Sequence, residues 1–335
     1  MNRSLIAIAG LAVLGFSCKD SNNDANVMGD WRAESPFEGV ARSQAASFVV
    51  GTKAYVATGW DSNNNRLADM WEYDSDRNTW SQKANFPGVA RTGAAGFAIG
   101  NKGYLGLGQP LGGQYLKDFY SYDPTTNKWT KIEDYAGTGR VGTVSFVINN
   151  KGYVGTGFDG NNLNDIYSYS PATATWTKET SFAGGKRQGA VAMVINNIAY
   201  VGTGTANNLS PRDWWAFDPS TQVWTQKKDF TNDQAAIARS YASSFVINNI
   251  GYLLMGATTS NDTKVWAYDA ATDLWSEVQN YGSDNNKYKV APTARQQAVS
   301  FSIGNRGFIT TGVGGSTRYD DIYSFDPAKA RVLAE

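Results

Sequence analysis

Histidine is absent from this 335-residue chain, and the only cysteine is Cys18. These absences exclude histidine general bases, Ser-His-Asp and Cys-His nucleophile systems, and the usual zinc and copper sites. Net charge is also lacking, because 30 basic residues balance 30 acidic ones. We therefore expect no nucleic-acid partner and no attraction to a membrane surface by bulk charge. No metal site and no cofactor is predicted.

Long hydrophobic runs are missing too, apart from a short one near the N-terminus. Arg3 precedes an apolar stretch at residues 5–14, which is too short to span a bilayer permanently. Residues 14–18, Leu-Gly-Phe-Ser-Cys, resemble a bacterial lipobox. We predict a lipoprotein signal peptide at 1–17 and a lipidated Cys18 with a polar tether at 18–28. Secretion with an incidental thiol is the alternative.

Tryptophan, by contrast, recurs along the chain at intervals of 47 to 51 residues. The six recurring positions are Trp31, Trp80, Trp129, Trp176, Trp224 and Trp275. An arginine opens each unit, at Arg42, Arg91, Arg140, Arg187, Arg239 and Arg295. An aromatic residue follows each arginine after 13 positions, and a glycine follows after four more. A period of about 40 to 50 residues with such marks predicts the blades of a β-propeller.

Each unit contains two hairpin signals. Residues 145–154 form two β-rich runs around an Asn/Gly turn, whose residues tolerate the positive φ of tight hairpins. A polar residue lies six positions before the tryptophan in the five complete units, often followed by proline, as in Asp123-Pro124. Proline fixes φ in a turn and cannot continue a sheet. Each unit is therefore expected to be a four-stranded antiparallel meander.

These marks resemble the kelch repeat over about residues 30 to 327. The resemblance implies an all-β, six-bladed kelch-type β-propeller at residues 29–335. The first glycine of the usual kelch pair is replaced throughout, by Thr58, Leu107, Thr156, Thr203, Met255 and Thr311. Galactose oxidase shares the kelch propeller, but its copper chemistry needs histidines and a tyrosine crosslinked to cysteine. That activity is therefore excluded.

The sixth unit has Val332 where tryptophan belongs, whereas Trp31 has no unit before it. Trp31 precedes Arg42 by 11 residues, the same gap that follows the next three tryptophans. We predict that a strand at residues 30–34 completes the last blade and leaves no open sheet edge. The alternative is a C-terminal strand around Val332. Each tryptophan is expected on an outermost strand, packed against a neighbouring blade.

Function is expected where the repeat varies. In a meander, the loops between the second and third strands and the loops between blades emerge on one face, called here the variable face. The gap from tryptophan to the next arginine is 11 four times, then 15 and 20. The insertions, at 230–237 and 281–289, flank the fifth blade, where Lys264 replaces the repeated aspartate. We expect a ligand site near blades 5 and 6. The repeated aspartates are Asp69, Asp118, Asp165, Asp213 and Asp321.

The repeated arginines permit two interpretations, an anion-binding ring at the channel mouth or structural pairing with the repeated aspartates. Their presence in every blade favours the structural role. In kelch domains that bind peptides, the residue two positions after this arginine faces the mouth. These residues, called here the rim residues, are Gln44, Gly93, Gly142, Gly189, Tyr241 and Gln297. The three glycines predict an open, less specific rim.

Non-repeating loop residues are the better ligand candidates, although most could be plain solvated loop residues. They are Trp60, Asp61, Arg66, Gln109, Tyr115, Asp159, Arg212, Tyr241, Asp262, Arg318 and Tyr319. Aromatic rings beside amides and charges suit sugars or peptide segments. The loops 61–65 and 159–162 are rich enough in oxygen for calcium, but Asn/Asp/Gly clusters are usually turns.

The leading hypothesis is a lipid-anchored binding module that recognises a protein or glycan of the cell envelope. We expect an exported monomer on the bacterial outer membrane, on its periplasmic or surface side, with membrane contact only through the anchor. The alternative is an enzyme that resembles the exported kelch mutarotases or epimerases acting on an anionic sugar such as sialic acid. No catalytic residue is assigned. A purely architectural envelope role is the third possibility.

Overall fold

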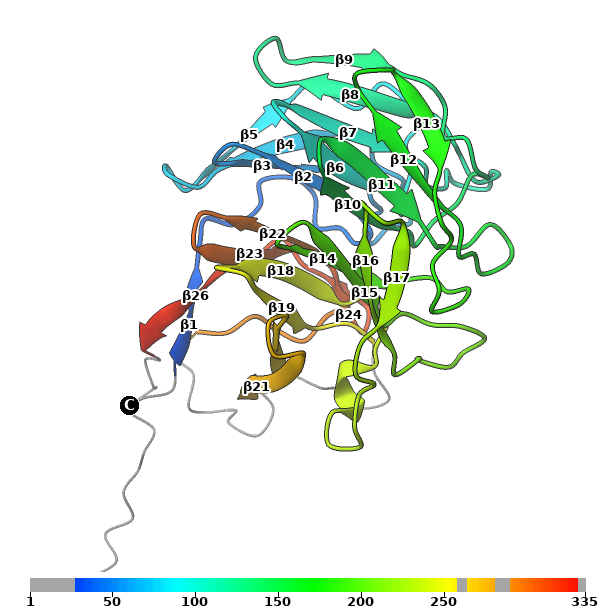
Figure 1. Ribbon diagram of the computed structural model, residues 1–335. Helices are drawn as coiled ribbons and strands as arrows, with labels where there is room; N and C mark the ends of the chain where they lie inside the picture. The colour runs from blue at the N-terminus through cyan, green and yellow to red at the C-terminus, as the bar shows by residue number, and fades with distance from the viewer. Residues whose placement is uncertain (1–27, 258–263, 281–289, 331–335) are drawn as a thin grey trace, which may run out of the picture.

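The computed structural model describes residues 28–257, 264–280 and 290–330, and these form six four-stranded antiparallel sheets arranged around an axis (Figure 1). In blades 1 to 5 the four strands follow the chain from the inner to the outer strand. Blade 1 consists of β2 (Ala46–Val50), β3 (Lys53–Ala57), β4 (Met70–Asp74) and β5 (Thr79–Lys83), and blade 2 of β6 (Ala95–Ile99), β7 (Lys102–Gly106), β8 (Phe119–Asp123) and β9 (Lys128–Lys131). Blade 3 consists of β10 (Val144–Ile148), β11 (Lys151–Gly155), β12 (Ile166–Ser170) and β13 (Thr175–Lys178), blade 4 of β14 (Val191–Ile195), β15 (Ile198–Gly202), β16 (Trp214–Asp218) and β17 (Val223–Gln226), and blade 5 of β18 (Ser243–Ile247), β19 (Ile250–Leu254), β20 (Lys264–Asp269) and β21 (Leu274–Asn280). The predicted all-β, six-bladed propeller is confirmed.

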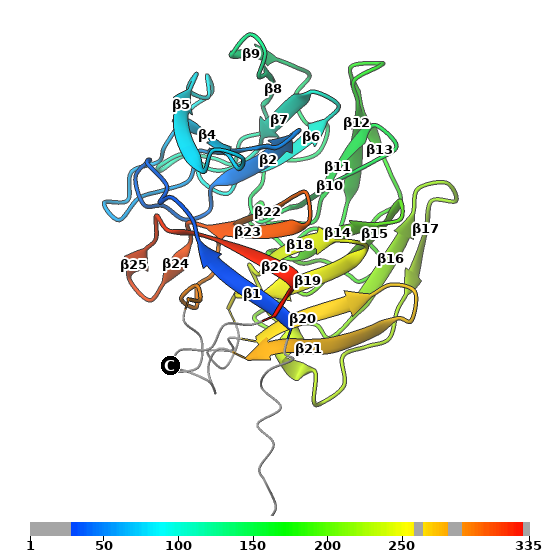
Figure 2. The same cartoon turned by 90° about the vertical axis from the view of Figure 1, so that its left-hand side faces the viewer.

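The sixth blade joins the two ends of the described chain. It consists of β22 (Val299–Ile303), β23 (Arg306–Thr310), β26 (Ile322–Ala330) and β1 (Met28–Ala33). Trp31 lies opposite Phe325, and the two strands run side by side in both views (Figures 1 and 2). The prediction that the Trp31 strand closes the ring is confirmed, and the alternative that placed Trp31 elsewhere is wrong. Val332 lies outside the described residues.

The core lies between the blades. Inner strands such as β10 alternate buried and half-buried residues, and the second strands are buried along almost their whole length. Six apolar clusters result, each shared by two neighbouring blades. Between blades 6 and 1, for example, the Tyr73 and Phe308 ring centroids lie 5.8 Å apart. A blade covers its apolar faces only by contacting both neighbours.

The repeated tryptophans lie on the outermost strands, as predicted, and each packs against the preceding blade. The Trp80 indole N–H donates to the carbonyl of Ser35, which follows β1 of blade 6, at 3.0 Å. The Trp129 indole donates likewise to Ala84, which follows the outer strand of blade 1. Trp31 is buried in the cluster between blades 5 and 6, so it has the same position as the other five.

The inner strands of neighbouring blades approach each other closely at the channel. A Cβ at Gly96 would lie 2.5 Å from the carbonyl oxygen of Ser47, so only glycine fits there. Serine hydroxyls link other inner strands: Ser145 donates to the Gly96 carbonyl and Ser300 to the Ser244 carbonyl. The channel wall is therefore a packed, hydrogen-bonded surface.

The predicted signal peptide at 1–17, Cys18 and the tether up to residue 27 lie outside the described residues, so their assignment stays a prediction. Within the described ranges, no helix has the length and apolar character needed to cross a membrane.

Ring closure generates a stability prediction. Trp31→Ala should destabilise the protein by about 3 to 5 kcal/mol, because it leaves a cavity between blades 5 and 6. Arg32→Ala, in the same strand but with an exposed side chain, is the matched control and should have little effect. Urea denaturation measures both. Equal midpoints for the two variants would contradict the closing role of Trp31.

Candidate functional site

The repeated arginines are buried and bound to the scaffold. Five of them form two-pronged ion pairs with the aspartate that precedes the third strand of the same blade: Arg42 with Asp69, Arg91 with Asp118, Arg140 with Asp165, Arg187 with Asp213 and Arg295 with Asp321. Both oxygens of Asp69 accept from Arg42 at 2.6 Å. The five arginine side chains are at most 1% exposed, so they do not offer a ring of ligand-binding groups.

Each arginine also holds the turn in which the kelch glycine pair is replaced. Arg42 Nη1 donates to the carbonyl of Thr58, whose φ is 62°. The equivalent residues of the other blades have φ between 54° and 62° and receive the same bond. Positive φ costs a non-glycine residue free energy, and such a conformation persists only where interactions with its surroundings offset that cost. The arginine bond therefore stabilises a conformation that glycine would adopt freely.

Blade 5 departs from this arrangement at Lys264. The ammonium group of Lys264 lies 2.7 Å from Glu277 and over the ring of Trp266. Arg239 donates to the carbonyls of Met255 and Ala236. Asp262, a predicted site residue of the same blade, lies outside the described residues.

The rim residues form a belt around one end of the channel. All six have positive φ, between 51° and 65°. Five hydrogen bonds join the amide of one rim residue to the carbonyl of the preceding one, as from Gly93 to Gln44 at 2.9 Å and from Tyr241 to Gly189 at 2.8 Å. The backbone polar groups are thus largely used within the belt. Side chains, more than backbone groups, are therefore what the mouth can offer to a ligand.

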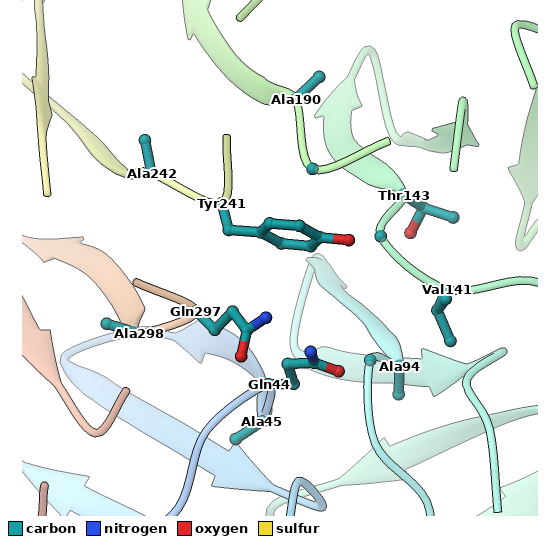
Figure 3. A pocket seen from close by; sticks show the side chains of 13 residues that line it. Gln44, Ala45, Ala94, Val141, Thr143, Ala190, Tyr241, Ala242, Gln297 and Ala298 are labelled. Carbon is teal, nitrogen blue, oxygen red and sulfur yellow. The ribbon is translucent and has the colours of Figure 1, made fainter. Parts of the chain in front are cut away.

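Tyr241 closes much of the space left by the rim glycines (Figure 3). A Cβ at Gly189 would lie 3.0 Å from the Tyr241 ring, and one at Gly142 would lie 3.3 Å from its hydroxyl oxygen. The hydroxyl donates to Oε1 of Gln188 at 2.9 Å. Burial raises the pKa of this hydroxyl above its usual range, so it stays protonated and remains a donor well beyond neutral pH. The rim is consequently less open than its three glycines predict.

A cavity of about 210 Å³ remains at this mouth. Side chains of Gln44, Gln297 and Tyr241 wall one part of it, and Thr143 lies near the tyrosine hydroxyl (Figure 3). The long rim side chains come from blades 1, 5 and 6, which are neighbours in the ring, whereas blades 2, 3 and 4 contribute glycine. The mouth is therefore asymmetric.

Four predicted site residues meet where blades 6 and 1 adjoin. Trp60 and Asp61 follow β3, Arg66 lies in the same loop, and Arg318 belongs to the short ribbon of β24 (Val313–Gly314) and β25 (Thr317–Arg318) in blade 6. The guanidinium carbons of Arg66 and Arg318 lie 4.9 and 4.0 Å from the centroid of the Trp60 ring. These four residues are called here the Trp60 cluster.

Asp61 serves the turn of its own loop. Its Oδ1 accepts from the amides of Asn63 and Asn65, and its Oδ2 accepts from the Asn65 side chain. Burial opposes ionisation, but these bonds and the charge of Arg318 hold the pKa of the Asp61 carboxyl below its usual range. The oxygen-rich segment 61–65 is thus a turn whose carboxylate already has hydrogen-bond donors.

The remaining predicted residues are dispersed over the variable face. Tyr115 packs edge-on against Phe158, and Asp159 accepts a hydrogen bond from the Thr138 hydroxyl. Arg212 donates to Asn232 at 3.0 Å. Gln109 makes a long bond to the carbonyl of Gly113 in its own loop, and Tyr319 packs against the guanidinium of Arg295. They do not form one site.

The insertion at 230–237 is largely structural. It contains the 3-10 turn η2 (Ala235–Ile237), and Phe230 and Ile237 are buried in the cluster between blades 4 and 5. The Gln234 amide donates to the carbonyl of Trp275. The insertion at 281–289 lies outside the described residues. Between blades 5 and 6, a cleft of about 460 Å³ is lined by Ala257, Arg295 and Tyr319 among others.

Sequence reasoning did not single out Gln188 or Thr143. Gln188 directly follows the repeated Arg187, and Thr143 stands where the five other blades have alanine at the channel mouth. A search for exceptions three positions after each arginine would have found Thr143, whereas the position of Gln188 varies from blade to blade and gives no such signal.

The fold and its repeated arginine–aspartate pairs define a six-bladed β-propeller. A kelch-motif model matches residues 41–87 and 103–134, and a model of the KLHDC2/KLHL20/DRC7 kelch-repeat domain matches residues 137–289. The chain therefore belongs to the kelch-repeat propellers.

Two known proteins illustrate this relationship. The Rab9 effector protein with kelch motifs of Homo sapiens is 29% identical over 109 residues, which are 31% of this chain and 27% of the human protein. The solved structure of YjhT has a TM-score of 0.71 and 17% identity, and the match covers 86% of this chain and 95% of YjhT. At this identity, the likeness to YjhT shows the fold alone.

The ion pairs generate a pH-dependent prediction. Burial opposes ionisation of Asp69, but the bonds from Arg42 outweigh it and lower the pKa of Asp69 below 3.8. Asp69→Asn should cost about 2 kcal/mol at pH 7, a modest value because Asp69 is partly exposed. A lowered carboxyl pKa stabilises the fold above the unfolded-state pKa, and this stabilisation is lost as the pH falls through the folded-state pKa.

Urea denaturation of wild type and Asp69→Asn between pH 7 and pH 3 measures this effect. The difference in unfolding free energy should narrow below pH 3.8. A difference that stays constant down to pH 3 would show that the ionised pair is not its source.

Proposed function

We propose that this kelch propeller is a binding module that takes a segment of a protein or glycan on the sector of its variable face formed by blades 5, 6 and 1. The observation that supports this most is the concentration of non-repeating side chains there. Gln44, Tyr241 and Gln297 supply the long rim side chains, and the Trp60 cluster lies beside them on blades 6 and 1. Aromatic, amide and guanidinium groups together are typical of binding surfaces.

The geometry favours binding over proton transfer. A general base needs a free lone pair near the reacting proton. The Asp61 carboxylate already accepts three hydrogen bonds within its turn, and its lowered pKa makes it a weak proton acceptor. The repeated aspartates are occupied by arginine. The mutarotase or epimerase alternative therefore becomes one outcome of the test below.

Attachment to the outer membrane through Cys18 is the second part of the proposal, and its support is the sequence of residues 1–18. Cys18→Ala should move the protein from the detergent phase to the aqueous phase in Triton X-114 partitioning, because the acyl chains supply the apolar surface. Wild type and Ser17→Ala should both enter the detergent phase. Recovery of the wild-type protein in the aqueous phase would contradict lipidation.

The binding surface is tested by capture with the full chain from a cell-envelope extract and on a glycan array. Tyr241→Ala should reduce capture about tenfold, because tyrosine is a common energetic centre of interfaces. Lys102→Ala, at the hairpin turn on the opposite face, is the control and should bind like wild type. Equal capture by wild type, Tyr241→Ala and Lys102→Ala would refute the proposal that the partner binds on this surface. Accelerated anomer exchange of sialic acid would support the enzyme instead.

A further inference from the structure

The Trp60 cluster contains three hydrogen-bond donors without an acceptor. Within the described ranges, the Nε of Arg66, the Nε of Arg318 and the Nε1 of Trp60 are buried and donate to no group. Arg66 does use its Nη1, which donates to the carbonyl and the side-chain oxygen of Asn64. Buried N–H groups are nearly always paired, and an unpaired one is costly. Three of them lie together on the variable face, where a ligand could supply the acceptor.

The charge of the cluster has the same implication. Two guanidinium groups face one indole, and burial together with the charge of Arg318 lowers the pKa of Arg66. Asp61 is the nearby carboxylate, but its oxygens already accept from Asn63 and Asn65. The cluster therefore keeps an excess positive charge that an anion would neutralise.

The molecule supplies its own template for the missing group. In five blades, an arginine lies over an aromatic ring and also forms a two-pronged pair with a carboxylate. These triads are Arg42, Phe37 and Asp69; Arg91, Phe86 and Asp118; Arg140, Tyr135 and Asp165; Arg187, Phe182 and Asp213; and Arg295, Tyr319 and Asp321. Arg318 over Trp60 reproduces the first two members of this triad. A two-pronged carboxylate is the member it lacks.

We infer that the Trp60 cluster binds a carboxylate, supplied by an aspartate or glutamate side chain of a peptide segment in the partner. This inference rests on the proposed function and specifies its ligand. The planar fork of a guanidinium matches the two oxygens of a carboxylate.

A peptide is favoured over a sugar for a steric reason. Sugar rings commonly dock on an exposed aromatic face. At Trp60, the indole is already contacted by the guanidinium groups of Arg66 and Arg318. The cluster also lies outside the lining of the channel-mouth cavity and of the cleft between blades 5 and 6. An acidic side chain needs only the edges of the guanidinium groups.

The experiment titrates the full chain with two peptides, acetyl-Ala-Glu-Ala-amide and acetyl-Ala-Gln-Ala-amide, and with glucuronate. NMR follows the Nε–H signals of Arg66 and Arg318 and the indole N–H of Trp60, assigned with Arg66→Lys, Arg318→Lys and Trp60→Phe. The glutamate peptide should shift these signals saturably, and the glutamine peptide should not. Glucuronate should bind more weakly than the glutamate peptide.

Variants locate the effect. Arg318→Gln should weaken binding of the glutamate peptide about tenfold or more, because it removes a charge-assisted hydrogen bond. Arg318→Lys keeps the positive charge but loses the planar guanidinium fork, so its affinity for the glutamate peptide should lie between those of Arg318→Gln and wild type. Arg212→Gln, on the same face but bonded to Asn232, is the matched control and should bind normally. If Arg318→Gln does not fold, titration of wild type with the two peptides still tests whether the Trp60 cluster binds a carboxylate.

Three results would overturn the inference: no shift with the glutamate peptide, equal shifts with the glutamine peptide, or glucuronate binding as tightly as the glutamate peptide. Partner capture that survives Arg318→Gln but is lost in Tyr241→Ala would also overturn it, while leaving the proposed binding function intact. Absence of any captured partner would instead count against the proposed function, and the titration would still decide the carboxylate site.

Discussion

Packing between neighbouring blades is the interaction on which the rest of the structure depends. Each four-stranded sheet has two apolar faces, and the described core consists of the six clusters between adjacent sheets. Such a ring is stable only when it is closed, because an open ring exposes two apolar faces and a strand edge. β1 supplies the last outer strand, with Trp31 packed on Phe325. The two ends of the propeller sequence are thereby joined in one blade.

The closed, repeating ring also distinguishes residues that maintain the fold from residues that are available for binding. Residues that recur from blade to blade, such as Arg42 and Trp80, meet the same local requirement in each blade that keeps the pattern, and both of these side chains are buried. Exceptions to the repeat are free of that requirement. Two groups of exceptions lie on blades 5, 6 and 1, where the rim has Tyr241 and where Arg318 meets Trp60, whereas others are dispersed over blades 2 to 4. A symmetric scaffold thus presents an asymmetric face, which is what selective binding requires.

The sequence was sufficient to predict the blades, the closing strand and the positions of the repeated tryptophans, because these follow from periodic patterns in local structure. It did not predict contacts between loops. Arg318 and Trp60 meet only after the ring closes, and neither residue belongs to the repeat. The three rim glycines predicted an open rim, but the Tyr241 side chain fills the space above Gly142 and Gly189. The insertion at 230–237 was expected near a ligand, but Phe230 and Ile237 draw it into the core.

Amide hydrogen exchange in the presence and absence of a captured partner tests the central claim, that binding occurs on the variable face, most directly. The account predicts added protection at the loop around Trp60 and Arg66 and at the rim around Tyr241. The hairpin turns at residues 51–52, 100–101 and 149–150, on the opposite face, should exchange as before. Added protection confined to those turns would contradict the account.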